Sequence, residues 1–495
     1  MTGGVVAAGH PVTAEAGAQV LRAGGNAVDA AIAAMLASWT AEPRLTRPGA
    51  GGYLLVAGPG VEPTLLDFFV AAPGIGAGAH PSRAELIPVS VSFGDAVQIF
   101  HVGAASCGPY GNPAGIVEAS RRWGRVPLDQ LTAPAARLAR EGVVLNAPQA
   151  YVFEILAGIL LSTPEARAVF APGGRPLREG ERFRFAEMGD AIDRLGSDGA
   201  EPFYRGDLAS AVVDWLRERG GVLTAGDLRE YAAVPREPAR VAYRGRTILT
   251  NPPPSAGGTL LAYAFGLLDR APSPPSLTAI VDAMDHAQSA RTDAFVAGLD
   301  EPGFLDRFLA ANLGSTTHIS AVDGEGLACA VTCTNGEGSG VVVPGTGIHV
   351  NNIMGEEDLS PLGFHTAPAG RRMPSMMAPT VVLRDGPQDV ELVLGSAGSN
   401  RIRSALLQTI VACVDHGMDA QAAVDAPRAH FESGVVYTEP GVPNDELERA
   451  GRTVAPFRAL NLFFGGVQAI RRAPDGEGLS AGGDPRRGGA VAGTG

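Results

Sequence analysis

The 495-residue chain contains no lysine, so all 39 of its strongly basic residues are arginine. This absence excludes a Schiff-base lysine, a Ser–Lys dyad and a P-loop lysine. The basic residues are outnumbered by 52 acidic ones, which gives a formal net charge of −13. Because the chain is acidic and has no basic run, nucleic acid and anionic membranes are poor candidates for its main partner.

Cysteine is also scarce, with four residues and no CxxC pair: Cys107, Cys329, Cys333 and Cys413. Cys329 and Cys333 fall in one strand-like segment, which separates them by about 13 Å at about 3.3 Å per residue. That distance is too long for a disulfide. We therefore expect all four to be small buried side chains.

Long apolar runs and targeting signals are missing as well. No stretch approaches the 18 apolar residues that a membrane span needs. The first residues lack the charged segment and apolar run of a signal peptide, so we expect a cytoplasmic protein. The nine histidines are scattered without metal-ligand spacing, and we expect neither a metal nor another cofactor.

What the chain does contain is a helix-rich first part and a strand-rich second part, divided near residue 314. Asn26 caps an alanine-rich helix to about residue 38, residues 49–56 lead from glycines into a strand, and 145–245 is mostly helical in pattern. Later strands are predicted at 318–322, 327–334, 341–343, 380–383 and 391–394, followed by a helix over 401–416. The Gly/Arg-rich tail, 476–495, is predicted to be partly mobile.

A hairpin stands at the start of the second part. Two β-type runs, 316–322 and 327–334, flank a turn rich in Asp and Gly. If the loop is 324–326, Thr316 lies opposite Thr334; a four-residue loop would place Cys333 there instead. Directly opposed side chains lie close together on one face, so pairing alone can bring two threonine hydroxyls side by side.

An ordinary cross-strand threonine pair would look the same, and a mid-chain threonine has no basic amine beside it. Cleavage of the Ser315–Thr316 bond would change this. The freed α-amino group, with an ordinary pKa of about 7.7–8.0, would serve as a general base for its own hydroxyl.

The stretch TTHISAVDGEG (316–326) resembles the start of the small subunit of γ-glutamyltranspeptidases, which are N-terminal nucleophile (Ntn) hydrolases. Further segments similar to that family follow in the same order: GGNAVDAAIAA (24–34), GAGGYLLV (49–56), EPFYRGDLA (201–209), PPPSAGG (252–258), RMPSMMAPTVV (372–382), GSAGSNRI (395–402) and DPRRGG (484–489). Several matches in the right order are more specific than one short motif.

The resemblance implies an α+β protein with the four-layer αββα sandwich of Ntn hydrolases. The precursor would cleave itself into a large subunit, 1–315, and a small subunit, 316–495, which pair as a heterodimer. Thr316 would transfer a γ-glutamyl group from a donor such as glutathione to water or an amine. Thr334 matches the threonine that hydrogen-bonds the nucleophile, and Gly398 and Ser399 match the oxyanion hole. Export is possible by the same analogy.

The sequence departs from the family in the substrate pocket. The position of the arginine that binds the substrate α-carboxylate is Phe69, and two polar positions have become Ile353 and Met376. Asn335 and Ser375 match substrate-binding positions that are retained. An acidic position best matches Glu356, with Glu357 and Asp358 as neighbouring alternatives.

These departures leave alternatives open. Four arginines are candidates to replace the missing one: Arg44, Arg47, Arg371 and Arg372. A less polar pocket would suit a cephalosporin- or glutaryl-type acylase with the same core chemistry. A third possibility is a family member that stays uncut and has no catalytic activity.

Overall fold

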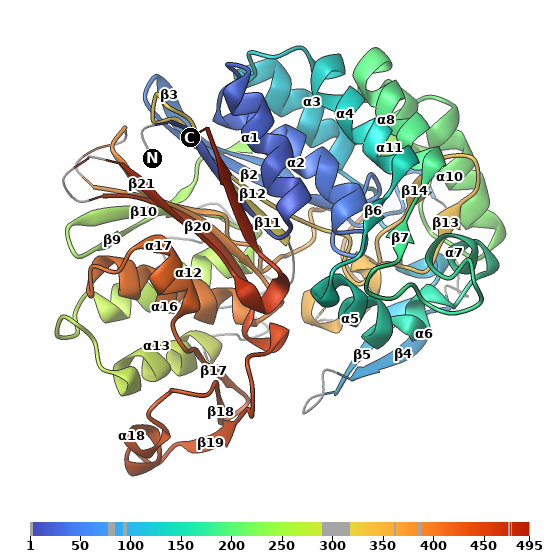
Figure 1. Cartoon of the computed structure of the whole chain (residues 1–495). Helices are drawn as coiled ribbons and strands as arrows, with labels where there is room; N and C mark the ends of the chain where they lie inside the picture. The colour runs from blue at the N-terminus through green and yellow to red at the C-terminus, as the bar shows by residue number, and fades with distance from the viewer. Residues whose placement is uncertain are drawn as a thin grey trace.

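A computed structural model describes residues 3–77, 85–92, 97–289, 317–360, 363–384, 386, 388–473, 476 and 478–494. The chain is a mixture of helices and mainly antiparallel sheets (Figure 1). Ser315 and Thr316 lie outside the described residues.

Two large antiparallel sheets dominate the molecule. The first has seven strands, in spatial order β22 (Ala490–Gly493), β1 (Val5–Ala8), β11 (Thr317–Val322), β12 (Ala328–Thr334), β2 (Gly51–Gly58), β3 (Val61–Phe68) and β8 (Val234–Arg236). The second has six strands, in the order β21 (Leu479–Gly483), β20 (Gly466–Arg472), β16 (Val390–Ala397), β15 (Thr380–Leu383), β10 (Arg246–Thr250) and β9 (Ala239–Tyr243).

Helices flank the sheets in two groups (Figure 1). The first group is α1 (Pro11–Arg22), α2 (Ala27–Ala41), α3 (Asn112–Trp123), α4 (Leu128–Glu141), α5 (Ala147–Ile155), α6 (Ala157–Leu160), α7 (Pro164–Phe170), α8 (Ala186–Asp198), α9 (Glu201–Tyr204), α10 (Asp207–Glu218) and α11 (Ala225–Arg229). The second group is α12 (Ala256–Leu268), α13 (Leu277–Ser289), α16 (Arg401–Val414), α17 (Ala420–Asp425) and α18 (Asn444–Arg449).

Four small sheets complete the described elements. They are β4 (Ile87–Ser92) with β5 (Val97–Val102), β6 (Val143–Val144) with β7 (Arg182–Phe183), β13 (Val342–Val343) with β14 (Ile348–His349), and β17 (Ala429–Glu432) with β18 (Val435–Thr438) and β19 (Thr453–Pro456).

Three buried apolar clusters show how these elements pack. One joins helices of the first group, including α2 and α4, to one face of the seven-stranded sheet, as at Val331. The opposite face, with Ala330, packs against the six-stranded sheet. The far face of the six-stranded sheet packs against α12, α13 and α16. Successive residues of β12 therefore point alternately towards helices and towards the other sheet, as a strand requires.

The predicted hairpin is confirmed in the described residues. Thr317 pairs with Cys333 and Val322 with Ala328, while the Asp323 amide donates to the Leu327 carbonyl at 3.0 Å. This is the register expected for a 324–326 loop, and the Asp323 carboxylate stabilises the turn by accepting the amides of Glu325 and Leu327. The register that opposes Cys333 to Thr316 is excluded.

Other predictions need correction. The described part of the tail contains two strands: β21 joins the six-stranded sheet and β22 pairs with β1. The 145–245 region also contains β7 to β9 in addition to its helices. The capping by Asn26 is confirmed, since its side chain accepts the amides of Val28 and Asp29. The four cysteines are buried and free, as expected.

Candidate active site

The open end of the β11–β12 hairpin is the place where the predicted active-site residues gather. Thr334 is the last residue of β12 and is 3% exposed. Its hydroxyl oxygen accepts the Gly336 amide at 2.8 Å, which leaves the hydroxyl proton available for donation. By alternation along β12, Thr334 lies on the same face as Ala330, towards the six-stranded sheet.

The Gly398–Ser399 loop emerges at this same end. At the opposite end of the hairpin, Arg472 of β20 lies against Gly326 in the turn. Midway, Ser320 donates to the Gln468 carbonyl at 3.0 Å. Because β16 pairs with β20 from Leu392–Arg471 to Ala397–Gly466, the residues after Ala397 leave the sheet beside the open end of the hairpin.

The backbone of this loop is unusual. Gly398 has φ of +121° and Ser399 has φ of +56°, a left-handed conformation that residues with a side chain rarely adopt. Their carbonyls accept the amides of Arg401 and Ile402, which starts α16. Among the described residues we find no acceptor for the Gly398 amide. A strained turn at a helix start is a recurrent feature of functional sites.

His318, on β11, is a structural residue. Its ring is buried, and its nitrogens lie 2.8 Å from the Thr332 hydroxyl and 2.9 Å from the Ser320 hydroxyl. Since Ser320 donates to Gln468, the ring must donate to Ser320 and accept from Thr332. Burial lowers the pKa of His318 to about 3. The ring therefore stays neutral and is held away from proton transfer.

Glu356 and Asn335 both lie next to Gly336, Glu356 in space and Asn335 in sequence. Both side chains are buried, and the Glu356 carboxylate and the Asn352 amide oxygen border the space where a Gly336 side chain would stand. The backbone N–H of Asn352 donates to the backbone carbonyl of Asn335 at 3.3 Å. Neither polar atom of the Asn335 side chain has a partner within the described part of the chain. Glu357 is exposed, in contrast.

The remaining predicted pocket residues are buried in apolar surroundings. Phe69 is fully buried between the sheets, with its ring 5.7 Å from that of Tyr53. Ile353 belongs to the same cluster, and Met376 belongs to the cluster beneath α12. Ser375 is also buried, and its hydroxyl oxygen accepts the Met377 amide at 3.0 Å. No described contact joins Ser375 to Thr334.

The four arginines considered as replacements for a carboxylate ligand differ in their surroundings. Arg372 is engaged elsewhere: it donates to the Phe69 carbonyl at 2.9 Å and lies 3.5 Å from the Asp67 carboxylate. Arg371 is half-buried. Arg44 and Arg47 are buried, and the loop that carries them borders the site, because the Leu45 carbonyl accepts the Asn335 amide at 3.1 Å.

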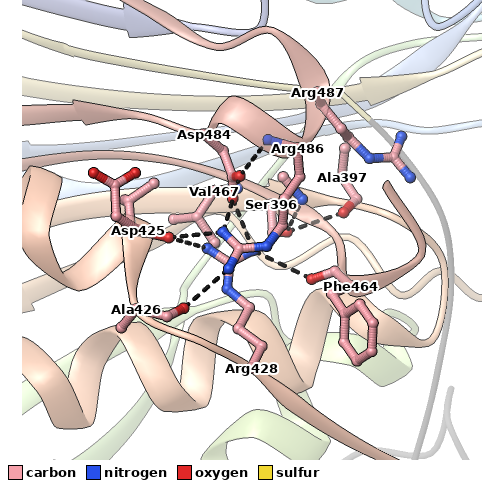
Figure 2. A network of polar contacts seen from close by, with 12 residues as sticks. Ser396, Ala397, Asp425, Ala426, Arg428, Phe464, Val467, Asp484, Arg486 and Arg487 are labelled. Atoms are coloured by element: carbon pink, nitrogen blue, oxygen red, sulfur yellow. Dashed lines mark hydrogen bonds and ion pairs between the residues drawn. The ribbon is translucent and has the colours of Figure 1, made fainter. Parts of the chain in front are cut away.

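The DPRRGG segment is fixed by a buried ion network (Figure 2). Asp484 lies 2.7 Å from Arg428 and 3.2 Å from Arg486, which also pairs with Glu439 at 2.5 Å. The Arg487 guanidinium points away from this network in Figure 2 and lies beside Gly398. Burial lowers the pKa of Arg487 to about 10, while the charge of Glu337 acts in the opposite direction.

Glu42 lies behind the hairpin and was not singled out from the sequence. It follows α2, is fully buried, and accepts the hydroxyls of Thr13 at 2.8 Å and Thr317 at 2.9 Å. Burial raises the pKa of Glu42 to about 7. An acid directly after a long apolar helix was the available sequence signal. The structure thus ties the residue after Thr316 to a buried carboxyl group.

The described residues contain neither a cluster of metal ligands nor a membrane-spanning helix. Within them there is no group of three or more His, Cys, Asp or Glu side chains arranged to hold a metal ion. No helix in that part of the chain is long and apolar enough to cross a membrane.

Comparison with known proteins gives matches along most of the chain. The gamma-glutamyltranspeptidase family model matches residues 13–302 and 305–494. The chain is 30% identical to the glutathione hydrolase proenzyme of Bacillus subtilis (strain 168), over 94% of this chain and 87% of that protein. It is equally 30% identical to the acylase ACY 1 proenzyme of Pseudomonas sp. (strain SE83), over 96% of this chain and 90% of that protein.

Among solved structures, the cephalosporin acylase from Bacillus halodurans superposes with a TM-score of 0.83 at 27% identity, covering 99% of this chain and 96% of that one. The family match therefore spans both the helix-rich and the strand-rich parts of the sequence, with the hairpin and the Gly398 loop inside it. The chain belongs to the gamma-glutamyltranspeptidase family of enzymes.

Proposed function

We propose that the protein is an autoprocessed acyltransferase and amide hydrolase whose nucleophile is Thr316. The observation that carries this proposal is the register of the hairpin: one further pair beyond Thr317–Cys333 would set Thr316 opposite Thr334. On that face the Thr334 side chain points between the two sheets, at the end where the Gly398 loop emerges, and a Thr316 hydroxyl in this register would stand beside it. In this proposal the helices, two sheets and helices correspond to the αββα layers of Ntn hydrolases.

Processing would cut the Ser315–Thr316 bond and give a large subunit, 1–315, and a small subunit, 316–495. The new α-amine of Thr316 takes the proton of its own hydroxyl, and the hydroxyl oxygen attacks the amide carbonyl of the donor. Thr334 donates its hydroxyl proton to the nucleophile, and the Gly398–Ser399 backbone stabilises the developing oxyanion. The amine leaves with the transferred proton.

The acyl group is then released from the enzyme by the same steps in reverse order. Water or an acceptor amine attacks the ester carbonyl, the Thr316 amine accepts the attacking proton, and the proton returns to the threonine oxygen. Every step uses groups that the two subunits themselves supply. The subunits would remain together as a heterodimer, because β1, β2 and β22 of the two pieces share one sheet.

For the donor, we propose a γ-glutamyl amide of the glutathione type. Its support is the Glu356 carboxylate, which lies with the Asn352 amide oxygen beside Gly336, the residue after Asn335; these acceptor groups suit an ammonium group. A specific observation favours the second candidate, a glutaryl- or cephalosporin-type acylase. Phe69, which the resemblance aligns with the carboxylate-binding arginine, is buried against Tyr53 and offers no guanidinium, so an acyl group without an α-amino-acid end would lose no contact there.

A direct comparison of two chromogenic donors tests the proposal. The purified protein should release p-nitroaniline from γ-glutamyl-p-nitroanilide with a higher kcat/KM than from glutaryl-p-nitroanilide. A clear preference for the glutaryl donor would establish the acylase alternative instead. Thr316→Ala should abolish turnover of both, whereas Thr317→Ser keeps the hydroxyl beside Glu42 and should retain turnover.

A further inference from the structure

Two buried arginines, Arg44 and Arg47, lie on the loop that contacts Asn335. Arg44 is 1% exposed and Arg47 is fully buried. Both guanidinium groups lie over the Phe170 ring, at 5.5 and 4.9 Å, and Arg47 also lies 5.1 Å from the Phe183 ring. Ring faces attract cations but cannot accept five N–H groups each.

Most of their donors lack an acceptor. Arg47 donates its Nε to the Pro43 carbonyl at 2.6 Å, while both of its Nη atoms have no partner in the described part of the chain. Arg44 donates one Nη to the Glu337 carbonyl, and its Nε and other Nη have no described partner. Buried donors are normally satisfied, because each one left unpaired costs about 1–3 kcal/mol.

The charges are also out of balance. Glu337 is the acid whose field acts on Arg44, but the same carboxylate also faces Arg401 and Arg487. Arg47 has a second cation, Arg44, beside it. Burial and the charge of Arg44 both lower the pKa of Arg47 well below the ordinary value. Among the described residues, a buried positive charge therefore remains without an anion of its own.

His349 completes the cluster from a third segment. Its ring is fully buried against Phe170, and both ring nitrogens are without a partner among the described residues. A side chain at Gly338 would stand 2.9 Å from His349 Nε2 and 3.3 Å from Arg44 Nη1, so these nitrogens lie within about 6 Å of each other. Gly338 has φ of +78°, and because glycine has no side chain, nothing from this residue fills the space between the His349 ring and the Arg44 guanidinium.

We infer that Arg44, Arg47 and His349 form a binding site for one small monoanion, a carboxylate group or an anion of similar size. A single negative charge would balance the uncompensated guanidinium and accept the donors that converge beside Gly338. The phenylalanine walls disfavour a compact, strongly hydrated dianion such as sulfate, whereas a dicarboxylate would bind through one of its two carboxylate groups.

Two sources would supply this chemistry. One is a free anion held as part of the folded protein. The other is the acid end of the acyl donor, since the loop bearing Arg44 contacts Asn335. The second source rests on the proposed function, whereas the first does not.

Thermal unfolding of the full-length protein tests the site independently of turnover. The protein is dialysed extensively into a buffer whose only anion is a bulky sulfonate, and is then titrated at constant ionic strength with chloride, acetate or glutarate. The inference predicts a saturable rise of the Tm. In Arg44→Met the apparent Kd should rise roughly tenfold or more, because a charge-assisted hydrogen bond is lost. Arg44→Lys should restore part of the affinity, and Arg217→Met, at an exposed position on α10, should behave like the wild type.

The pattern among anions distinguishes the sources. Saturation by chloride and acetate alike supports a resident free anion. Stronger saturation by glutarate, together with a rise in KM but not a fall in kcat for an anionic donor in Arg44→Lys, supports the donor's carboxylate. A Tm that does not respond to any of the three anions, or that responds equally in wild type and Arg44→Met, would overturn the site. A wild-type protein that shows the anion response but turns over neither donor would reject the proposed function alone.

Discussion

Glu42 provides the sharpest test of how the structure holds the start of β11. The carboxyl group lies in a buried space between α1, α2 and β11, with two hydroxyl donors and no cation paired to it among the described residues. Burial raises the pKa of Glu42 from 4.5 to about 7, although the bonds from Thr13 and Thr317 act in the opposite direction. Folding therefore favours the protonated form of this acid.

The sign of the pH dependence follows from proton counts. Between pH 4.5 and about 7 the unfolded chain has released the Glu42 proton while the folded chain still holds it. The free energy of unfolding therefore falls as pH rises through this window, and it is constant with respect to this group below and above it. At about 1.4 kcal/mol for each pH unit, the full effect is roughly 3 kcal/mol.

Glu42→Gln removes this titration. Chemical denaturation of Glu42→Gln and its parent, both in a Thr316→Ala background that keeps one uncut chain, should be compared from pH 4.5 to 8. The glutamine costs about 1 kcal/mol at every pH, since one threonine loses its acceptor. Relative to the parent, the free energy of unfolding of the variant should rise by roughly 3 kcal/mol between pH 4.5 and pH 8. A difference that stays flat, as expected for the exposed Glu218→Gln control, or that slopes the other way would refute the assignment.

Three further substitutions test the packing around the site. Gly395→Ala should lose about 1–3 kcal/mol of unfolding free energy, because the new methyl group overlaps the His318 ring; Gly266→Ala, which has open space, should not lose stability. Asp484→Asn should lose about 3–5 kcal/mol, measured by the same denaturation, since it leaves the buried Arg428 guanidinium without a carboxylate partner among the described residues; near-neutral behaviour would contradict the network in Figure 2. Phe69→Arg should lower the Tm without improving KM for a γ-glutamyl donor, and a stable variant with improved KM would show that the wall is open to substrate.

The hairpin could be predicted because its information is local. The turn residues Asp323 to Gly326 fix the loop, and the loop fixes the register of both strands. The same holds for the Asn26 cap of α2, where the cap and the first turn are neighbours in sequence. Within the second part, the strand over 380–383 and the helix that begins at Arg401 also agree with their patterns.

Elements that depend on distant partners could not be predicted in this way. Strand β22 is ordered because it pairs with β1 at the other end of the chain, so its glycine-rich sequence gave no local signal for order. The short strands β6 and β7 interrupt a region that reads as helical for the same reason.

The site shows the same division. The motifs identify Gly398 and Thr334, but they do not reveal that β20 and β16 align these residues at one end of the sheet. Arg44, Arg47 and His349 are drawn from segments about 300 residues apart, and arginine is usually exposed. Only the fold shows that they are buried together.

The central claim is that Thr316 becomes an N-terminal nucleophile, and the mass of the purified protein tests it most directly. Intact mass spectrometry under denaturing conditions, with N-terminal sequencing, should find two polypeptides, 1–315 and 316–495, the second beginning at Thr316. Thr316→Ala should remain one chain. A wild-type protein that is found as a single full-length chain yet turns over its donor would contradict the mechanism.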